Sequence, residues 1–199
     1  MSTVSLLDIQ IPEDRFEIRL SGSGGQGLVL AAMLLAEAIG ADPTKSVIQT
    51  KSYGPEARGG ASKSDVVVSD GEIYYQKALK LDLLLAMTQE SLNKYYPDLK
   101  DGGILVIDDS LVSKVPTEDY YGLSFTRIAK EQLKNVMVAN VISLGAIAAI
   151  TNVVPLDALL TAVLALAPRG TEEVNRVAVE TGYQEGLALK QKRTQPAAV

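Results

Sequence analysis

The sequence predicts an α/β fold of three layers, in which helices cover both faces of a mostly parallel, partly mixed, Rossmann-like sheet, followed by a helical C-terminal part. Residues 16–20 alternate apolar and charged side chains as a strand does, and residues 28–39 repeat apolar positions at helical spacing. The continuous apolar runs 81–87 and 104–107 suit strands that are buried on both faces of a sheet. Strands and helices therefore alternate along the first half of the chain.

We expect a single domain over residues 16–189, with a flexible leader at 1–15 and a flexible tail at 190–199. In the helix over 28–39, Leu30, Leu34 and Ala38 are expected to face the core, and Gly40 to form its C-terminal cap. In the first half of the chain we also predict a strand over 47–53, a hairpin of 66–68 and 73–75 that turns at Asp70-Gly71, and a helix that is capped by Thr88 or Ser91 and ends before Pro97. In the second half we predict a helix over 126–133, a last strand over 136–138 and a buried or interface helix over 139–150. Two further helices follow, one with Pro155 at its first position and one over 171–189.

The composition excludes several kinds of site. The 199 residues contain neither cysteine nor histidine. The chain alone therefore provides no thiolate-held iron–sulfur cluster, no Cys/His zinc site, no cysteine nucleophile and no histidine general base. Adjacent Asp108 and Asp109 follow a predicted strand, but neighbouring side chains on a strand point to opposite faces, so helix capping or turn formation is favoured over a metal site.

Charge and hydropathy also bear on partners and location. The net charge of −5, without a basic stripe, argues against nucleic acid. The N-terminal residues lack the pattern of a signal peptide, and the longest apolar stretch, 136–150, is too short to span a bilayer. We expect a cytoplasmic protein with no membrane partner.

A glycine-rich turn joins the first predicted strand to the first helix. It comprises Gly22, Ser23, Gly24, Gly25, Gln26 and Gly27. Glycines let a bound group approach the backbone, and the first amides of a helix carry the positive end of its dipole, so a phosphate would bind here. The alternative is a turn that only packs strand against helix. A dinucleotide site is disfavoured, because the G-x-G-x-x-G spacing is not followed about 20 residues on by an acidic residue.

A second glycine-rich segment follows the next strand, and we expect it at the same carboxyl edge of the sheet. Its Arg58 has a guanidinium suited to a carboxylate or phosphate, and Glu56 would hold it in place; the alternative is a mobile loop with a solvated ion pair. The candidate binding residues of this region are Lys51, Tyr53, Gly54, Glu56, Arg58, Gly59 and Gly60.

The two segments carry a family resemblance. The runs Ile18-Arg19-Leu20-Ser21-Gly22-Ser23-Gly24-Gly25-Gln26-Gly27 and Gln49-Thr50-Lys51-Ser52-Tyr53-Gly54-Pro55-Glu56-Ala57-Arg58-Gly59-Gly60-Ala61 resemble the gamma subunit of 2-oxoacid:ferredoxin oxidoreductases. The likeness covers roughly residues 16–182 and includes Asn140 and the segment 169–171. The second run looks like the 2-oxoglutarate branch of this family.

The resemblance implies a supporting subunit of a thiamine diphosphate enzyme. Such a complex decarboxylates its 2-oxoacid oxidatively, passes the acyl group to coenzyme A and sends electrons through iron–sulfur clusters to ferredoxin. The expected partners are alpha and beta subunits, a ferredoxin-like delta subunit as a further candidate, ferredoxin and coenzyme A, while thiamine diphosphate, magnesium and the clusters belong to other subunits. The two glycine-rich segments would complete the active-site and coenzyme A pocket, with Arg58 in a supporting catalytic role.

Other interpretations stay open at this point. One is a stand-alone Rossmann-type oxidoreductase, another is a purely structural subunit whose glycine loops only dock on a partner, and a third is the beta subunit of indolepyruvate oxidoreductase.

Overall fold

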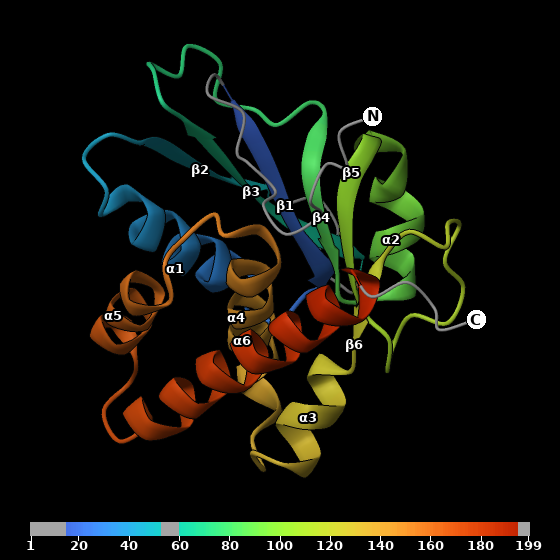
Figure 1. The fold of residues 1–199 in the computed structure, drawn as a ribbon, viewed down its shortest axis with the longest axis vertical. Coiled ribbons are helices and arrows are strands. Elements are labelled where there is room, and N and C mark those ends of the chain that lie inside the picture. The colour runs from blue at the N-terminus through green and yellow to red at the C-terminus, as the bar shows by residue number, and fades with distance from the viewer. Residues whose placement is uncertain (1–14, 53–59, 195–199) are drawn as a thin grey trace.

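A computed structural model describes residues 15–52 and 60–194 (Figure 1). Its elements in chain order are β1 (Phe16–Ser23), α1 (Leu28–Gly40), β2 (Ser46–Ser52), β3 (Ala61–Ser69), β4 (Leu81–Ala86), α2 (Gln89–Tyr95), the short 3₁₀ helix η1 (Tyr96–Asp98), β5 (Leu99–Asp108), β6 (Tyr121–Leu123), α3 (Phe125–Glu131), the 3₁₀ helix η2 (Val136–Val138), α4 (Ala139–Thr151), α5 (Leu156–Leu166) and α6 (Glu172–Thr194).

Within the described residues, the six strands form one sheet in the order β2-β3-β1-β4-β5-β6. Strands β1, β4, β5 and β6 pair in parallel, whereas β3 runs antiparallel to both of its neighbours, β1 and β2. Since β2 and β1 each run opposite to β3, their carboxyl ends lie at the same edge of the sheet. The prediction of a mostly parallel, partly mixed sheet is confirmed.

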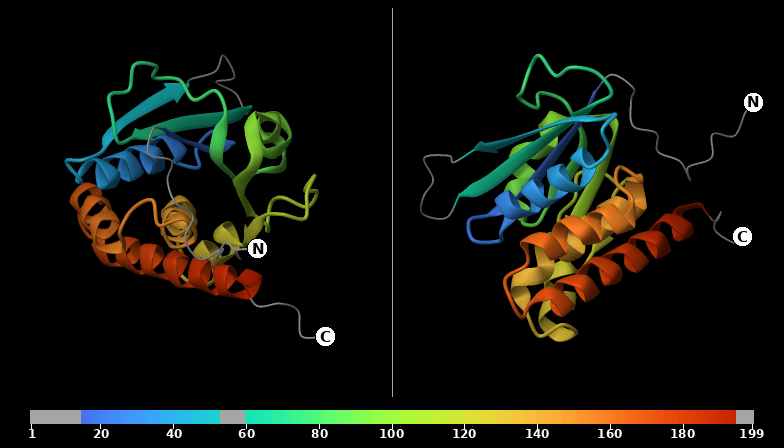
Figure 2. Two further views of the ribbon diagram at one scale, coloured as in Figure 1. Left: turned by 45° about the horizontal axis from the view of Figure 1, so that its top comes forward. Right: turned by 90° about the vertical axis from the view of Figure 1, so that its left-hand side faces the viewer.

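The two faces of the sheet are covered unequally. On one face, apolar side chains of β1, β3, β4 and β5 join those of α1, α3, α4, α5 and α6 in the larger core. On the other face, the alternate side chains of β3, β4 and β5 pack against α2 and the segments beside it. Figure 2 shows the C-terminal helices gathered on the side of the sheet that α1 covers. The chain is therefore a three-layer α/β/α domain with its helical C-terminal part on one side.

Helix α4 is the centre of the helical layer, and all thirteen of its residues are buried. It crosses α6 at very short range because glycines line the contact. A Cβ atom built on Gly182 would lie 1.9 Å from the carbonyl oxygen of Ile142, and one on Gly145 would lie 2.1 Å from that of Val179. No larger side chain fits at these two positions without moving the helices apart.

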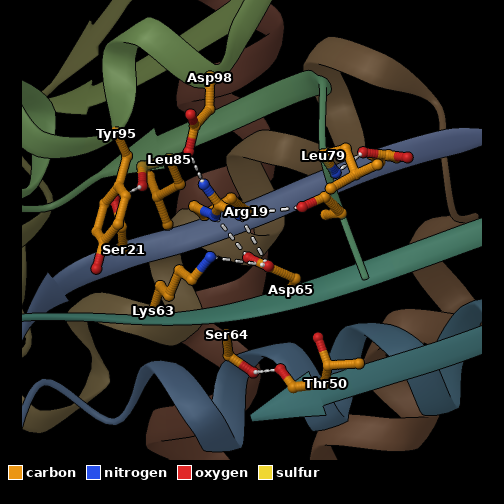
Figure 3. A network of polar contacts seen from close by, with 12 residues as sticks. Arg19, Ser21, Thr50, Lys63, Ser64, Asp65, Leu79, Leu85, Tyr95 and Asp98 are labelled. Atoms are coloured by element: carbon orange, nitrogen blue, oxygen red, sulfur yellow. Dashed lines mark hydrogen bonds and ion pairs between the residues drawn. The ribbon is translucent and has the colours of Figure 1, made fainter. Parts of the chain in front are cut away.

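The charged face of β1 is buried, although its alternating pattern is typical of a half-exposed strand. Glu17, Arg19 and Ser21 point away from α1 and are all enclosed. Figure 3 shows how the Arg19 guanidinium is paired: it donates to both carboxylate oxygens of Asp65, at 2.7 and 2.9 Å, and it pairs with Asp98. Burial acts to lower the pKa of Arg19, but the two aspartates outweigh it and raise that pKa above its ordinary value.

Several sequence expectations are wrong. Residues 73–75 form no strand, so the hairpin at Asp70-Gly71 is absent and β3 pairs with β1 and β2 instead. Residues 136–138 form η2, and the last strand is the short β6, which lies earlier in the chain. Pro155 directly precedes α5 as its N-cap and does not occupy its first position.

Helix α1 also departs from expectation at two residues. Leu30 is 43% exposed, although Leu34 and Ala38 are buried as predicted. Gly40 is the last helical residue and has no left-handed conformation, so it is not the cap. The flexible tail expected over 190–199 is wrong for residues 190–194, which continue α6 and include the buried Lys190. The predictions for residues 1–14 and 195–199 lie outside the described residues.

Candidate functional site

The glycine-rich turn lies at the carboxyl edge of the sheet, between β1 and α1. The backbone amide of Met87, just after β4, donates to the carbonyl of Ser21 at 2.8 Å, which extends the β1–β4 pairing to this edge. The turn therefore sits at the end of the central parallel strands. This edge is where open α/β sheets bind their ligands.

Gln26 shapes the turn from within. Its side-chain oxygen accepts a hydrogen bond from the backbone amide of Ser23 at 2.8 Å. The same oxygen lies 2.2 Å from where a Cβ atom on Gly22 would stand, so any side chain there would displace the Gln26 amide from this hydrogen bond. This bond links the two ends of the turn within the chain. The role of Gln26 in binding a ligand stays a prediction.

Gly27 joins the turn to two helices. Its φ of 72° is left-handed, and it is the N-cap of α1, with no side-chain hydrogen bond to cap the helix. The buried side chain of Asn140, in the first turn of α4, donates to the Gly27 carbonyl at 3.1 Å. A Cβ atom on Gly27 would lie 2.5 Å from that donating nitrogen. Asn140 thus fixes the N-terminus of α1 against α4.

Gly24 and Gly25 differ from their neighbours in the room around them. Among the described residues, a Cβ atom on either would meet no atom within 4 Å apart from those of its neighbours along the chain. The first amides of α1 lack partners inside the helix and carry the positive end of its dipole, and the first turn of α1 contains no acidic residue to neutralise it. An anionic group can therefore approach the backbone at this part of the turn.

The second glycine-rich segment begins and ends at the same edge. Ser52, the last residue of β2, pairs with Lys63, which pairs in turn with Ser21 of β1. At the other end of the segment, Ala61 pairs with Ser23, so Gly60 lies beside the glycine turn. Five candidates lie outside the described residues, namely Tyr53, Gly54, Glu56, Arg58 and Gly59.

Lys51 shares both the edge and the face of the glycine turn. Two residues before it, the side chain of Gln49 donates to the carbonyl of Val29 at 2.9 Å, so this face of β2 is turned toward the first turn of α1. Residues two apart on a strand share a face, and Lys51 is exposed. The structure therefore brings an exposed lysine to the side of the sheet on which the amides of α1 begin.

A largely apolar groove of about 230 Å³ adjoins the turn. Gly27 and Leu30 lie along its α1 side, and Met137 of η2 and Leu166 of α5 are exposed beside them. Asn140, Thr171 and Asn175 supply polar groups to its lining. Sequence reasoning missed this groove because it assigned Leu30 to the core; the helical stripe gives no sign that one leucine would be left uncovered.

The two adjacent aspartates have structural roles, as favoured from the sequence. Asp108 is fully buried and accepts hydrogen bonds from the backbone amide and hydroxyl of Thr126, in the first turn of α3. Asp109 accepts from Ser124. Across residues 15–52 and 60–194, no three His, Cys, Asp or Glu side chains are grouped to hold a metal ion. In the same residues, no helix has the length and apolar character needed to cross a bilayer.

Comparison with known proteins identifies relatives over nearly the whole chain. Residues 17–185 match the family model described as pyruvate ferredoxin/flavodoxin oxidoreductase. The 2-oxoglutarate synthase subunit KorC of Methanocaldococcus jannaschii is 47% identical over 88% of this chain and 96% of its own length. These relatives favour an oxidoreductase subunit over a stand-alone Rossmann-type enzyme.

Solved structures give the same result. The gamma subunit of keto/oxoacid ferredoxin oxidoreductase from Geobacter sulfurreducens is 44% identical and superimposes with a TM-score of 0.81, covering 88% of this chain and 98% of the other. The 2-oxoglutarate:ferredoxin oxidoreductase of Magnetococcus marinus shares the fold, with a TM-score of 0.76 at 22% identity, over 94% of this chain and 32% of that one. The chain therefore belongs to the pyruvate ferredoxin/flavodoxin oxidoreductase family and is a subunit of an oxidoreductase complex.

Proposed function

We propose that this chain is the gamma subunit of a cytoplasmic 2-oxoglutarate:ferredoxin oxidoreductase, which converts 2-oxoglutarate and coenzyme A to succinyl-CoA and carbon dioxide and passes electrons to ferredoxin. The observation that supports 2-oxoglutarate as the substrate is the 47% identity to a 2-oxoglutarate synthase subunit over almost the full length of that subunit. In the proposal, the alpha and beta subunits hold thiamine diphosphate, magnesium and iron–sulfur clusters, which would supply the chemistry of decarboxylation and electron transfer. A ferredoxin-like delta subunit is a further candidate partner.

The task of this chain in the proposal is to bind coenzyme A beside the active site. Coenzyme A carries phosphates on one part and a mainly uncharged arm on another. The open side of the glycine turn at Gly24 and Gly25 offers backbone amides to a phosphate, and Lys51 offers a positive charge on the same face. The adjoining groove is largely apolar and fits an uncharged chain. Arg58 and Glu56 remain proposed supporting residues of the same pocket.

The test is a kinetic comparison in the purified complex. Lys51→Ala and Arg58→Ala should each raise the KM for coenzyme A by roughly 10–100-fold, because a charge-assisted hydrogen bond is worth roughly 1.5–3 kcal/mol and 1.4 kcal/mol is a factor of ten. The KM for 2-oxoglutarate should stay unchanged. Lys45→Ala is the matched control, because Lys45 precedes β2 at the opposite edge, where it pairs with Asp70.

Either of two results would contradict this assignment. In one, the Lys51 and Arg58 variants keep the wild-type KM for coenzyme A. In the other, Lys45→Ala changes that KM as much as they do. Loss of assembly with normal coenzyme A kinetics in the remaining complex would instead support a purely structural role for the glycine segments.

A further inference from the structure

The groove beside the glycine turn is uncharged, since none of the described residues that line it carries a charge. Charges of both signs lie next to the lining in sequence. Lys134 and Arg169 are exposed and positive, Glu172 is exposed and negative, and Arg176 pairs with Glu173 at 3.8 Å. Burying a charge without a partner is costly, and the border of the groove favours neither sign. The part of a ligand that lies in this groove is therefore expected to be uncharged.

Two of the polar residues in the lining are engaged within the protein. The buried Asn140 donates to the carbonyl of Gly27, and its side-chain oxygen accepts from the next backbone amide at 2.8 Å. The hydroxyl of Thr171 donates to the carbonyl of Pro168 at 2.7 Å and accepts from the side chain of Asn175 at 3.1 Å. These contacts hold the walls of the groove together.

Asn135 offers a hydrogen-bond donor to the groove. Its side-chain oxygen accepts from the backbone amide of Met137 at 3.1 Å and caps η2. Because a backbone amide can only donate, this bond fixes which end of the side chain is the oxygen, and Nδ2 is the end left over. Nδ2 has no acceptor among the described residues, where every buried side-chain nitrogen and oxygen has a partner, so it reaches solvent.

Asn175, in the first turn of α6, offers an acceptor. Its Nδ2 donates to the carbonyl of Thr171 at 2.8 Å and to the hydroxyl of the same residue at 3.1 Å, so both of its hydrogens are engaged. A carbonyl can only accept, so the opposite end of the side chain is Oδ1. Oδ1 has no donor within the described part of the chain and also reaches solvent. The groove thus combines an oriented donor and an oriented acceptor with apolar walls.

We propose that this groove binds the uncharged arm of coenzyme A through the secondary amides of that arm, with Asn135 donating to an amide carbonyl and Asn175 accepting from an amide N–H. This inference rests on the proposed function, in which the glycine turn takes the phosphates. Gly27 belongs to both the turn and the groove, so the arm can pass directly from one to the other. Phosphates are common to many nucleotides, whereas an amide-bearing arm is not, so the two asparagines select the acyl acceptor.

An extended peptide carries the same amides, but the surroundings favour the arm. The groove is small, about 230 Å³, and ends at backbone amides suited to a phosphate, which a peptide does not have. The arm of coenzyme A is continuous with phosphates. A peptide segment of a partner subunit is therefore left as an outcome of the test.

The experiment measures the KM for coenzyme A in the purified complex at saturating 2-oxoglutarate. Asn135→Asp keeps the oxygen that caps η2 and replaces the donor by an acceptor, so the KM should rise roughly tenfold or more. Asn175→Ala should raise it roughly 3–10-fold. Asn93→Asp is the matched control: Asn93 is an exposed asparagine of α2, on the other face of the sheet, whose oxygen accepts from Gln89 at 2.9 Å. It adds the same charge and should leave the KM unchanged.

A second measurement separates the arm from the phosphates. The adenosine bisphosphate half of coenzyme A, which lacks the arm, is used as a competitive inhibitor. Asn135→Asp and Asn175→Ala should leave its inhibition constant at the wild-type value, whereas Lys51→Ala should raise it. The isolated variants should melt within a few degrees of wild type, because each asparagine is changed at a group that reaches solvent.

The outcomes distinguish this inference from the proposed function. A wild-type KM in both asparagine variants, with a raised KM in Lys51→Ala, would overturn the inference alone. An equal effect of Asn93→Asp, or weaker inhibition by the half molecule in the asparagine variants, would also overturn it. Poor assembly with a normal KM in the remaining complex would show that a peptide of a partner occupies the groove. A wild-type KM in the asparagine and Lys51 variants alike would overturn the coenzyme A assignment itself.

Discussion

Replacing Gly24, Gly25 and Gly27 of the turn by alanine, one at a time, should change the free energy of unfolding in three distinct ways. Gly24 has no left-handed φ, and no described residue beyond its chain neighbours lies within 4 Å of a built Cβ, so Gly24→Ala should be neutral or stabilising by up to about 1 kcal/mol. Gly25 has a φ of 90° in equally open surroundings, so Gly25→Ala should cost only the backbone strain, roughly 1–2 kcal/mol.

Gly27→Ala should cost more, because strain and a clash act together. Its φ of 72° adds roughly 1–2 kcal/mol of strain, as at Gly25. The new Cβ would also stand 2.5 Å from the side-chain nitrogen of Asn140 and displace it from the Gly27 carbonyl. Leaving a buried amide without its partner costs about 1–3 kcal/mol, which gives roughly 2–5 kcal/mol in all.

Urea unfolding of each variant, followed by circular dichroism, measures these differences. The double variant Gly27→Ala/Asn140→Ala should be more stable than the sum of the single changes predicts, by about 1–2 kcal/mol, because the clash needs both side chains. If Gly27→Ala were as stable as Gly24→Ala, or if the two single effects simply added, the proposed contact between the turn and α4 would be refuted.

Two further predictions concern packing away from the turn. Arg19→Met should lower the free energy of unfolding by up to about 3–5 kcal/mol in the same assay, because buried Asp65 then keeps only Lys63, 3.4 Å away, as an ion-pair partner. The double change Arg19→Met/Asp65→Leu should recover much of this loss, and failure to recover would contradict the pairing. Gly182→Ala should lower the melting temperature by many degrees, since its Cβ would lie 1.9 Å from a backbone oxygen of α4. Gly40→Ala is the control and should not lower it, because no described residue beyond the chain neighbours of Gly40 lies within 4 Å of a built Cβ. Equal melting temperatures of the two variants would show that α4 and α6 can separate without cost.

The parts of the fold that could be predicted are those fixed by local pattern. The glycine turn, the buried strands and the small-residue helix α4 appear where apolar spacing places them, and Thr88 caps α2 with Ser91 as expected. The hairpin at Asp70-Gly71 failed because β3 already has a partner on each side: the preceding strand β2, and β1, which is more distant in sequence. No local signal distinguishes a two-residue turn from the start of a long connection.

The candidate site shows the same division. Glycine spacing predicted the turn and its edge, whereas the hydrogen bond from the Ser23 amide to the Gln26 side chain is visible only in the structure. The contact between Gly27 and Asn140 spans more than a hundred residues, so its geometry could not be read from either segment alone. Likewise, the burial of Arg19 depends on Asp65 and Asp98 arriving from other elements.

The most direct test of the proposed function is to tag this chain in its own host, purify it gently and assay the product for dye reduction. We expect alpha and beta subunits that carry thiamine diphosphate and iron–sulfur clusters to co-purify, with dye reduction that requires both 2-oxoglutarate and coenzyme A. Recovery of a lone inactive chain, or of a complex that reduces dye with another 2-oxoacid but not with 2-oxoglutarate, would contradict the assignment.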